Sequence, residues 1–144
     1  MADTISAELD EIAEEFDLLD SWEDRYQHLI DLGRSLVPLP DESRNEETKV
    51  RGCASQVWLA RQPDDNGRLS WIGDSDAHLV RGLIAVVLRL YSGRPPAEIT
   101  AFDSHASLKR LGLDSALSSQ RSNGLKSMIE RIRKEASEAG HDET

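Results

Sequence analysis

The chain is organised around one segment, Val50-Arg51-Gly52-Cys53-Ala54-Ser55-Gln56-Val57-Trp58-Leu59. A charged stretch precedes it and its last three residues are apolar, so Cys53 should lie where an exposed loop enters a strand. Gly52 allows backbone angles that residues with a Cβ avoid. This combination suits a thiol that moves between a protected and a presented position.

Cys53 is the only cysteine among 144 residues, and two interpretations of it stand side by side. A thiol reacts as its thiolate, and nearby cations lower its pKa. Lys49 and Arg51 are such cations in sequence, although Glu46 and Glu47 partly offset them. Free cysteine is also a frequent small apolar filler of protein cores. The residues alone therefore leave a nucleophile and an inert core residue equally open.

The length and net charge of the chain limit the classes of protein to which it can belong. A chain of 144 residues fits one domain, taken here as residues 1–144, with a core of its own. The formal charge of −10, from 27 acidic and 17 basic residues, disfavours binding to nucleic acids and to anionic membranes. A basic patch on a protein partner remains compatible with it.

The residue types present also exclude several kinds of site. One cysteine excludes an internal disulfide and any multi-thiolate metal site, and the four histidines are scattered without a His-x-x-x-His pair, so neither a metal nor a cofactor is predicted. Residues 1–4 lack the basic start and apolar run of a secretory signal. The apolar stretch at 79–91 is too short to span a bilayer. We therefore expect a cytoplasmic protein, in which a lone thiol stays reduced.

The first half of the chain is predicted to form two helices followed by a β-hairpin. Helices are predicted at 5–16 and from Ser21 to just before Pro38, followed by a Pro- and charge-rich connector at 38–49. Strands are predicted at 55–60 and 69–72, joined by a turn at 63–67, with Trp58 and Trp71 sharing one face of the core.

The second half of the chain is predicted to be mostly helical. Gly73-Asp74-Ser75-Asp76 should end the hairpin and cap a helix at 77–91 that is apolar nearly all round and hence central. Short helices are predicted at 97–102 and 107–111, the latter closed by Gly112. A last helix should run from 118 or 119 to 137, with a frayed end from about residue 140.

Several pieces of the sequence resemble the SufE family, the sulfur acceptors of iron–sulfur cluster assembly. The pattern Val50-x-Gly52-Cys53-x-Ser55-x-Val57-Trp58-Leu59 resembles the signature of that family. Four further pieces resemble it in the same order: Trp22-Glu23-Asp24-Arg25-Tyr26 with Leu29-Ile30-x-Leu32-Gly33, Leu39-Pro40, Gly73-Asp74-Ser75-Asp76-Ala77 with Gly82-Leu83-Ile84-Ala85-Val86-Val87, and Arg121-Ser122-Asn123-Gly124-Leu125. The chain departs from the pattern at Ser119-Gln120, where a proline is usual.

The resemblance implies an α+β fold, with a small antiparallel sheet and helices packed around it, as in IscU-type scaffold proteins. It implies that Cys53 takes persulfide sulfur from a PLP-dependent cysteine desulfurase of the SufS or CsdA type, activates that enzyme, and passes the sulfur to an iron–sulfur scaffold protein. Such a protein is a carrier rather than a stand-alone enzyme. A cluster scaffold supplies several thiolates, typically four per cluster, and this chain has one.

Three other residues are assigned to the predicted site. By its place in the matched turn, Arg121 could stabilise a thiolate or persulfide anion on Cys53, the alternative being an ordinary surface arginine. Gly52 would let the loop reverse outward, and Asp76 is assigned mainly to helix capping and secondly to tethering the loop. Two other functions stay open: a thiol redox protein or sensor acting through a Cys53 sulfenic acid, and a passive interaction module. A weak homodimer is an open alternative to a monomer.

Overall fold

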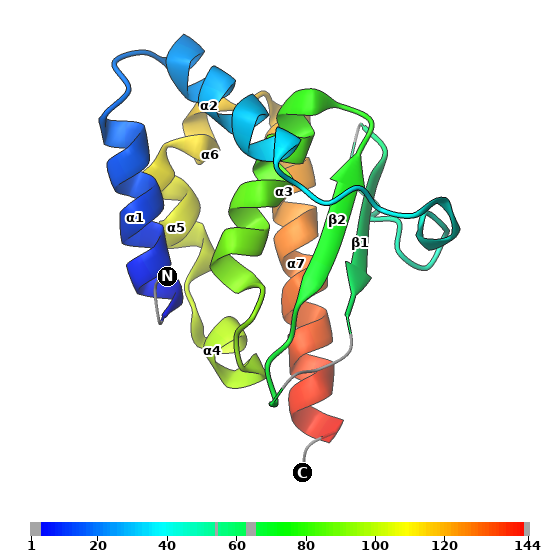
Figure 1. Cartoon of the computed structure of the whole chain (residues 1–144). Helices are drawn as coiled ribbons and strands as arrows, with labels where there is room; N and C mark the ends of the chain where they lie inside the picture. Colours follow the sequence, from blue (N-terminus) through cyan, green and yellow to red (C-terminus); the bar gives the residue numbers. More distant parts are fainter. Residues whose placement is uncertain (1–3, 54, 63–65, 143–144) are drawn as a thin grey trace.

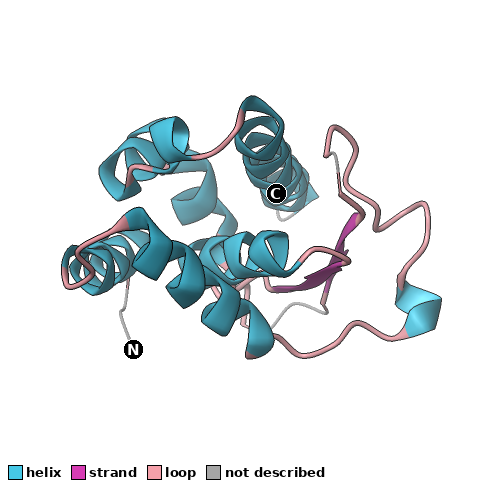
Figure 2. Cartoon of the chain, turned by 90° about the horizontal axis from the view of Figure 1, so that it is seen from above, coloured by secondary structure: helices cyan, strands magenta, loops and turns pink. Residues whose placement is uncertain are grey.

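The computed structural model describes residues 4–53, 55–62 and 66–142, and it has an α+β fold. Helices and a two-stranded antiparallel sheet form one body in which the sheet lies at one side (Figures 1 and 2). The elements in chain order are α1 (Ile5–Asp17), α2 (Trp22–Arg34), the 3-10 helix η1 (Asp41–Ser43), β1 (Val57–Arg61), β2 (Trp71–Ser75), α3 (His78–Tyr91), α4 (Pro96–Ala101), α5 (Ser104–Leu111), α6 (Leu113–Ala116) and α7 (Ser119–Asp142).

Helix α3 occupies the centre, as its apolar sequence predicts. It contacts α1, α2, α7 and β2, and most of its residues are buried. Gly82 makes the closest of these contacts possible, because a Cβ there would lie 2.0 Å from the Leu29 carbonyl oxygen on α2. Gly33 on α2 meets the same stretch of α3, since its Cβ would lie 2.7 Å from the Gly82 nitrogen. The backbones of α2 and α3 therefore touch through two glycines.

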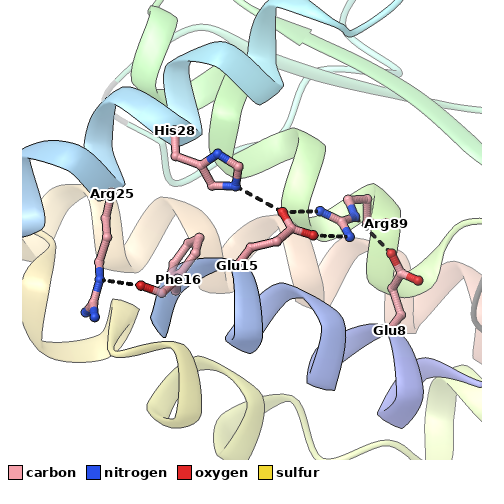
Figure 3. Close-up of polar contacts among 6 residues, drawn as sticks. All are labelled: Glu8, Glu15, Phe16, Arg25, His28 and Arg89. Atoms are coloured by element: carbon pink, nitrogen blue, oxygen red, sulfur yellow. Dashed lines mark hydrogen bonds and ion pairs between the residues drawn. The ribbon is translucent and has the colours of Figure 1, made fainter. Parts of the chain in front are cut away.

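Helix α1 is fastened to the rest of the helical layer by a partly buried ion network, drawn in Figure 3. The Arg89 guanidinium on α3 donates to Glu8 at 2.8 Å and to both Glu15 oxygens at 3.0 and 2.8 Å. Glu15 Oε1 also lies 3.0 Å from Nε2 of His28 on α2. One carboxylate thus joins three helices.

The register of the sheet corrects one sequence prediction. Trp58 pairs with Asp74, and Trp71 pairs with Arg61, so the two tryptophans point to opposite faces rather than sharing one. Trp71 is buried on the face turned toward the helices, whereas Trp58 is half-buried on the other face. The reason is the register: Trp71 pairs with Arg61, three residues from Trp58 on β1, and residues an odd number apart along a strand point to opposite faces.

The connector covers the outer face of the sheet (Figure 2). The Arg44 guanidinium lies over the Trp58 ring at 5.3 Å and donates to Asp74 Oδ2 at 2.6 Å. Asp74 also accepts from the Leu39 and Ser75 N–H groups, at 3.4 and 2.8 Å. The carboxylate of Asp74 therefore attaches the first part of the connector to the sheet.

Other element boundaries differ from the sequence predictions in detail. The N-cap of α3 is Ala77, which has no capping side chain, so Asp76 is not the cap. Helix α7 continues to Asp142, well beyond the predicted end, and α6 was not predicted. Asn66 and Gly67 have the positive φ angles expected of the predicted turn, the rest of which lies outside the described residues.

Candidate functional site

Cys53 lies in a loop with a hydrogen-bonded neck. The Val50 N–H donates to the Val57 carbonyl at 2.9 Å, and the Leu59 N–H donates to the Thr48 carbonyl at 2.8 Å. Residues 48–50 thus pair with the start of β1 on the edge away from β2, and the loop between Val50 and Val57 projects from that short ladder. The sequence prediction of a loop leading into a strand is confirmed at this position.

Helix α7 packs against the Cys53 loop. The Cys53 thiol donates to the Gly124 carbonyl at 3.6 Å, and a Cβ at Gly124 would lie 3.4 Å from the Cys53 sulfur. Gly52 has a φ of +89°, and a Cβ there would lie 2.7 Å from the Ser127 hydroxyl. Gly52 is therefore required both by its left-handed backbone and by its contact with α7.

A small pocket opens beside the thiol. Its volume is about 20 Å³, enough for one water-sized group. The walls are mostly apolar and come from the Cys53 loop, β1, α3 and α7: Cys53, Ser55, Val57, Val80, Leu83, Gln120, Arg121, Gly124, Leu125 and Met128. The thiol is half-buried, so it has both a sheltered side and an open one.

Burial sets the resting electrostatics of Cys53. It raises the pKa of the thiol, because the thiolate loses hydration in an apolar pocket. The expected help from Arg51 is not seen, since its exposed guanidinium pairs with Glu46 at 2.5 Å. Burial therefore favours the neutral thiol over the thiolate at this position.

The structure places Arg121 at the pocket and Asp76 beside the end of the Cys53 loop. Arg121 is exposed in the first turn of α7 and lines the pocket with Cys53. Asp76 Oδ1 accepts from the Gln56 N–H at 3.1 Å, so it tethers the segment between the loop and β1. Of the two roles considered for Asp76, tethering is the one with a contact in the structure.

Sequence reasoning missed Gly124 as a site residue. In the sequence it belongs only to the matched turn, yet its missing side chain makes room for the sulfur. A signal was present, because a glycine inside a helix costs stability and usually has a packing reason. The sequence around Gly124 does not show which side chain packs against it, because that depends on the fold.

Two further searches bear on the class of site. Within the described part of the chain, no cluster of three or more His, Cys, Asp or Glu side chains could hold a metal ion. In the same residues, no helix is both long enough and apolar enough to cross a lipid bilayer.

Comparisons with known proteins agree with one another. The family model described as "SufE: Fe-S metabolism associated domain" matches residues 10–136, nearly the whole chain. The chain belongs to the SufE family. An uncharacterized SufE-like protein of Rhizobium etli is 53% identical over 133 residues, covering 90% of each chain. A second, from Rhizobium meliloti, is 50% identical over 131 residues, covering 89% of this chain and 94% of its own.

A solved structure supports the fold of this SufE-family chain independently. The solution structure of a hypothetical protein from Thermus thermophilus superposes with a TM-score of 0.74. The match covers 92% of this chain and 95% of that one, at 19% identity. At that identity the likeness concerns the fold alone, and it agrees with the predicted α+β arrangement. Membership of the family associates the chain with iron–sulfur metabolism.

Proposed function

We propose that this protein is a cytoplasmic sulfur carrier, a single domain that accepts sulfur on Cys53 from a PLP-dependent cysteine desulfurase and delivers it to an iron–sulfur scaffold protein. One observation carries the proposal: in a SufE-family chain, the only cysteine lies half-buried beside a pocket with room for one more small group. A terminal persulfide sulfur is a group of that kind. Shelter matters because persulfides react readily with stray thiols and oxidants.

The transfer itself is a thiol–persulfide exchange. The Cys53 thiol loses its proton, and the thiolate attacks the outer sulfur of the donor's cysteine persulfide. A new S–S bond forms on Cys53 while the S–S bond of the donor breaks, and the donor cysteine leaves as a thiolate. The exchange is redox-neutral overall, so no separate oxidant or reductant is required.

The pocket suggests roles for the neighbouring groups. Because burial raises the pKa of the resting Cys53 thiol, the attack should follow movement of the loop toward the partner. The left-handed Gly52 offers a pivot for that movement. Arg121, exposed at the rim of the same pocket, supplies a positive charge for the thiolate or the persulfide anion.

Intact mass spectrometry after incubation with a cysteine desulfurase and cysteine tests the proposal. We expect a mass gain of one sulfur on the wild-type chain, faster desulfurase turnover, and loss of both effects in Cys53→Ser. Because Cys53 is the only cysteine, the site of the added sulfur needs no further mapping. A chain that gains no sulfur and leaves turnover unchanged would overturn the proposal.

A second candidate function is a thiol redox protein acting through a Cys53 sulfenic acid. The exposed side of the half-buried thiol favours it, since an oxidant could reach the sulfur. It predicts an oxygen adduct with dilute peroxide and no response to the desulfurase. The raised pKa of Cys53 weighs against it, because redox-sensor cysteines have low thiol pKa values.

A further inference from the structure

Arg131 on α7 reaches the backbone that leads into the Cys53 loop. Its Nη1 donates to the Lys49 carbonyl at 3.1 Å, and its Nη2 donates to the Glu47 carbonyl. Its Nε donates to Glu135 Oε1 at 2.6 Å. One guanidinium therefore holds two main-chain carbonyls, that of Lys49 in the bridge with β1 and that of Glu47 in the turn just before it.

The guanidinium is itself held in place. The second oxygen of Glu135 accepts from the indole N–H of Trp71 at 3.2 Å, and Trp71 is buried in β2. Glu135 and Arg131 are four residues apart on α7, so they lie on the same face of the helix. A continuous line of contacts thus runs from β2 through α7 to the carbonyls before Cys53.

We propose that Arg131 is a positioning residue that fixes the resting place of the Cys53 thiol. The loop projects from a ladder formed by residues 48–50 and β1, and Arg131 holds one side of that ladder against α7. Holding this side keeps Gly52 on Ser127 and the sulfur on Gly124, where the thiol is half-buried. The partners are carbonyls, so the contact depends on the position of the main chain.

The planar guanidinium suits this task better than other cations. It presents several donors in a fixed fork, so it can hold two carbonyls and a carboxylate at once. A lysine at position 131 could retain the charge and one contact, but not all three. Conservative replacement should therefore give partial rather than full recovery.

Helix α7 offers a matched control in Arg133. Its guanidinium also donates to main-chain carbonyls, those of Phe102 and Thr100, both at 3.2 Å. These partners lie in and just after α4, and neither belongs to the Cys53 loop or to the segment before it. Arg131→Gln and Arg133→Gln thus each remove two contacts with main-chain carbonyls from one helix, but only the first acts on the segment from which the Cys53 loop projects.

The test is the rate at which iodoacetamide alkylates Cys53 in the full chain, measured by intact mass across a range of pH. We expect Arg131→Gln to raise the rate constant roughly fivefold or more, since charge-assisted hydrogen bonds are among the stronger ones. The rate–pH profile should also shift toward that of an exposed thiol. Arg133→Gln should change neither quantity, and Arg131→Lys should fall between Arg131→Gln and the wild type.

The possible results separate cleanly. An unchanged alkylation rate in Arg131→Gln, or an equal increase in Arg133→Gln, would overturn the positioning role. The consequence for sulfur transfer rests on the proposed function. If Cys53 carries a persulfide, we expect the Arg131→Gln variant to lose that persulfide faster than the wild type when glutathione is added. Because alkylation needs no desulfurase, the positioning role can stand even if Cys53 proves to accept no sulfur.

Discussion

The contact between Cys53 and Gly124 leaves little free space beside the sulfur. A Cβ at position 124 would make an ordinary contact with the sulfur, at 3.4 Å, so Gly124→Ala should fold. It would nevertheless occupy part of a pocket of only about 20 Å³. Under the proposed function, the absence of a side chain at Gly124 leaves space for a second sulfur on Cys53.

Gly124→Ala should separate stability from function. We expect a higher melting temperature, because alanine is favoured over glycine inside a helix by about 1 kcal/mol. We also expect a lower yield or a shorter lifetime of the Cys53 persulfide, measured by intact mass after incubation with a desulfurase. Gly140→Ala is the control, since only Pro96 lies near, at 3.8 Å. Equal persulfide lifetimes in the two variants would contradict the explanation.

Local sequence could predict which residues form the site but not how they are held. The glycine–cysteine pair before an apolar run indicates a loop entering a strand, and the structure has that loop. Arg121 was assigned by its place in a matched motif, and it does line the pocket. The contacts of Arg131 with residues 47 and 49 join positions more than eighty residues apart, and no local pattern encodes such a contact.

At the scale of elements, the packing of α2 on α3 positions one wall of the pocket. Val80 and Leu83, which line the pocket, come from the part of α3 that α2 presses upon at Gly82. The contact is between backbones, so side chains cannot rearrange to relieve an added atom. Any change in this spacing should be transmitted to the walls around Cys53.

Gly82→Ala tests that transmission. Its Cβ would lie 2.0 Å from the Leu29 carbonyl oxygen, so α2 must move, and we expect a loss of at least about 1–3 kcal/mol in the free energy of unfolding. Equilibrium urea unfolding measures it. The rate of Cys53 alkylation should change in the same variant. Gly140→Ala again serves as the control, and a Gly82→Ala variant as stable as the wild type would refute the close contact.

Elements were easier to predict than their register. The long apolar helix and the hairpin follow from periodicity and composition, and both are confirmed. The misplaced Trp58 and Trp71 show the limit, because moving a strand pairing by one residue exchanges its two faces. Asp74 on β2 is held by Arg44 and Leu39 of the connector, and these partners are thirty or more residues away in sequence, so no local pattern shows them.

At the scale of the whole molecule, two carboxylates tie distant parts together. Asp74 joins the connector to the sheet, and its pKa is lowered because backbone N–H groups, Arg44 and Arg81 outweigh the opposing effect of burial. Glu15 joins α1 to α2 and α3, and its pKa is lowered mainly by the hydrogen bonds from Arg89. Lowering the pH should therefore weaken two separate sets of contacts. One set joins α1 to α2 and α3, and the other joins the connector before Cys53 to the sheet.

The contacts of Glu15 predict the direction in which the free energy of unfolding changes with pH. Because its pKa is lower folded than unfolded, the carboxylate stabilises the fold above about pH 4.5, and that contribution disappears as the pH falls through the lower, folded value. Glu15→Gln should cost on the order of 1 kcal/mol at pH 7, a figure reduced by partial solvent exposure. Urea unfolding at a series of pH values should show this gap closing below pH 4.5. Glu14→Gln, exposed one residue away, should show no closing gap. A Glu15→Gln deficit that stays constant down to acid pH would mean that the network of Figure 3 holds α1 by packing rather than by charge.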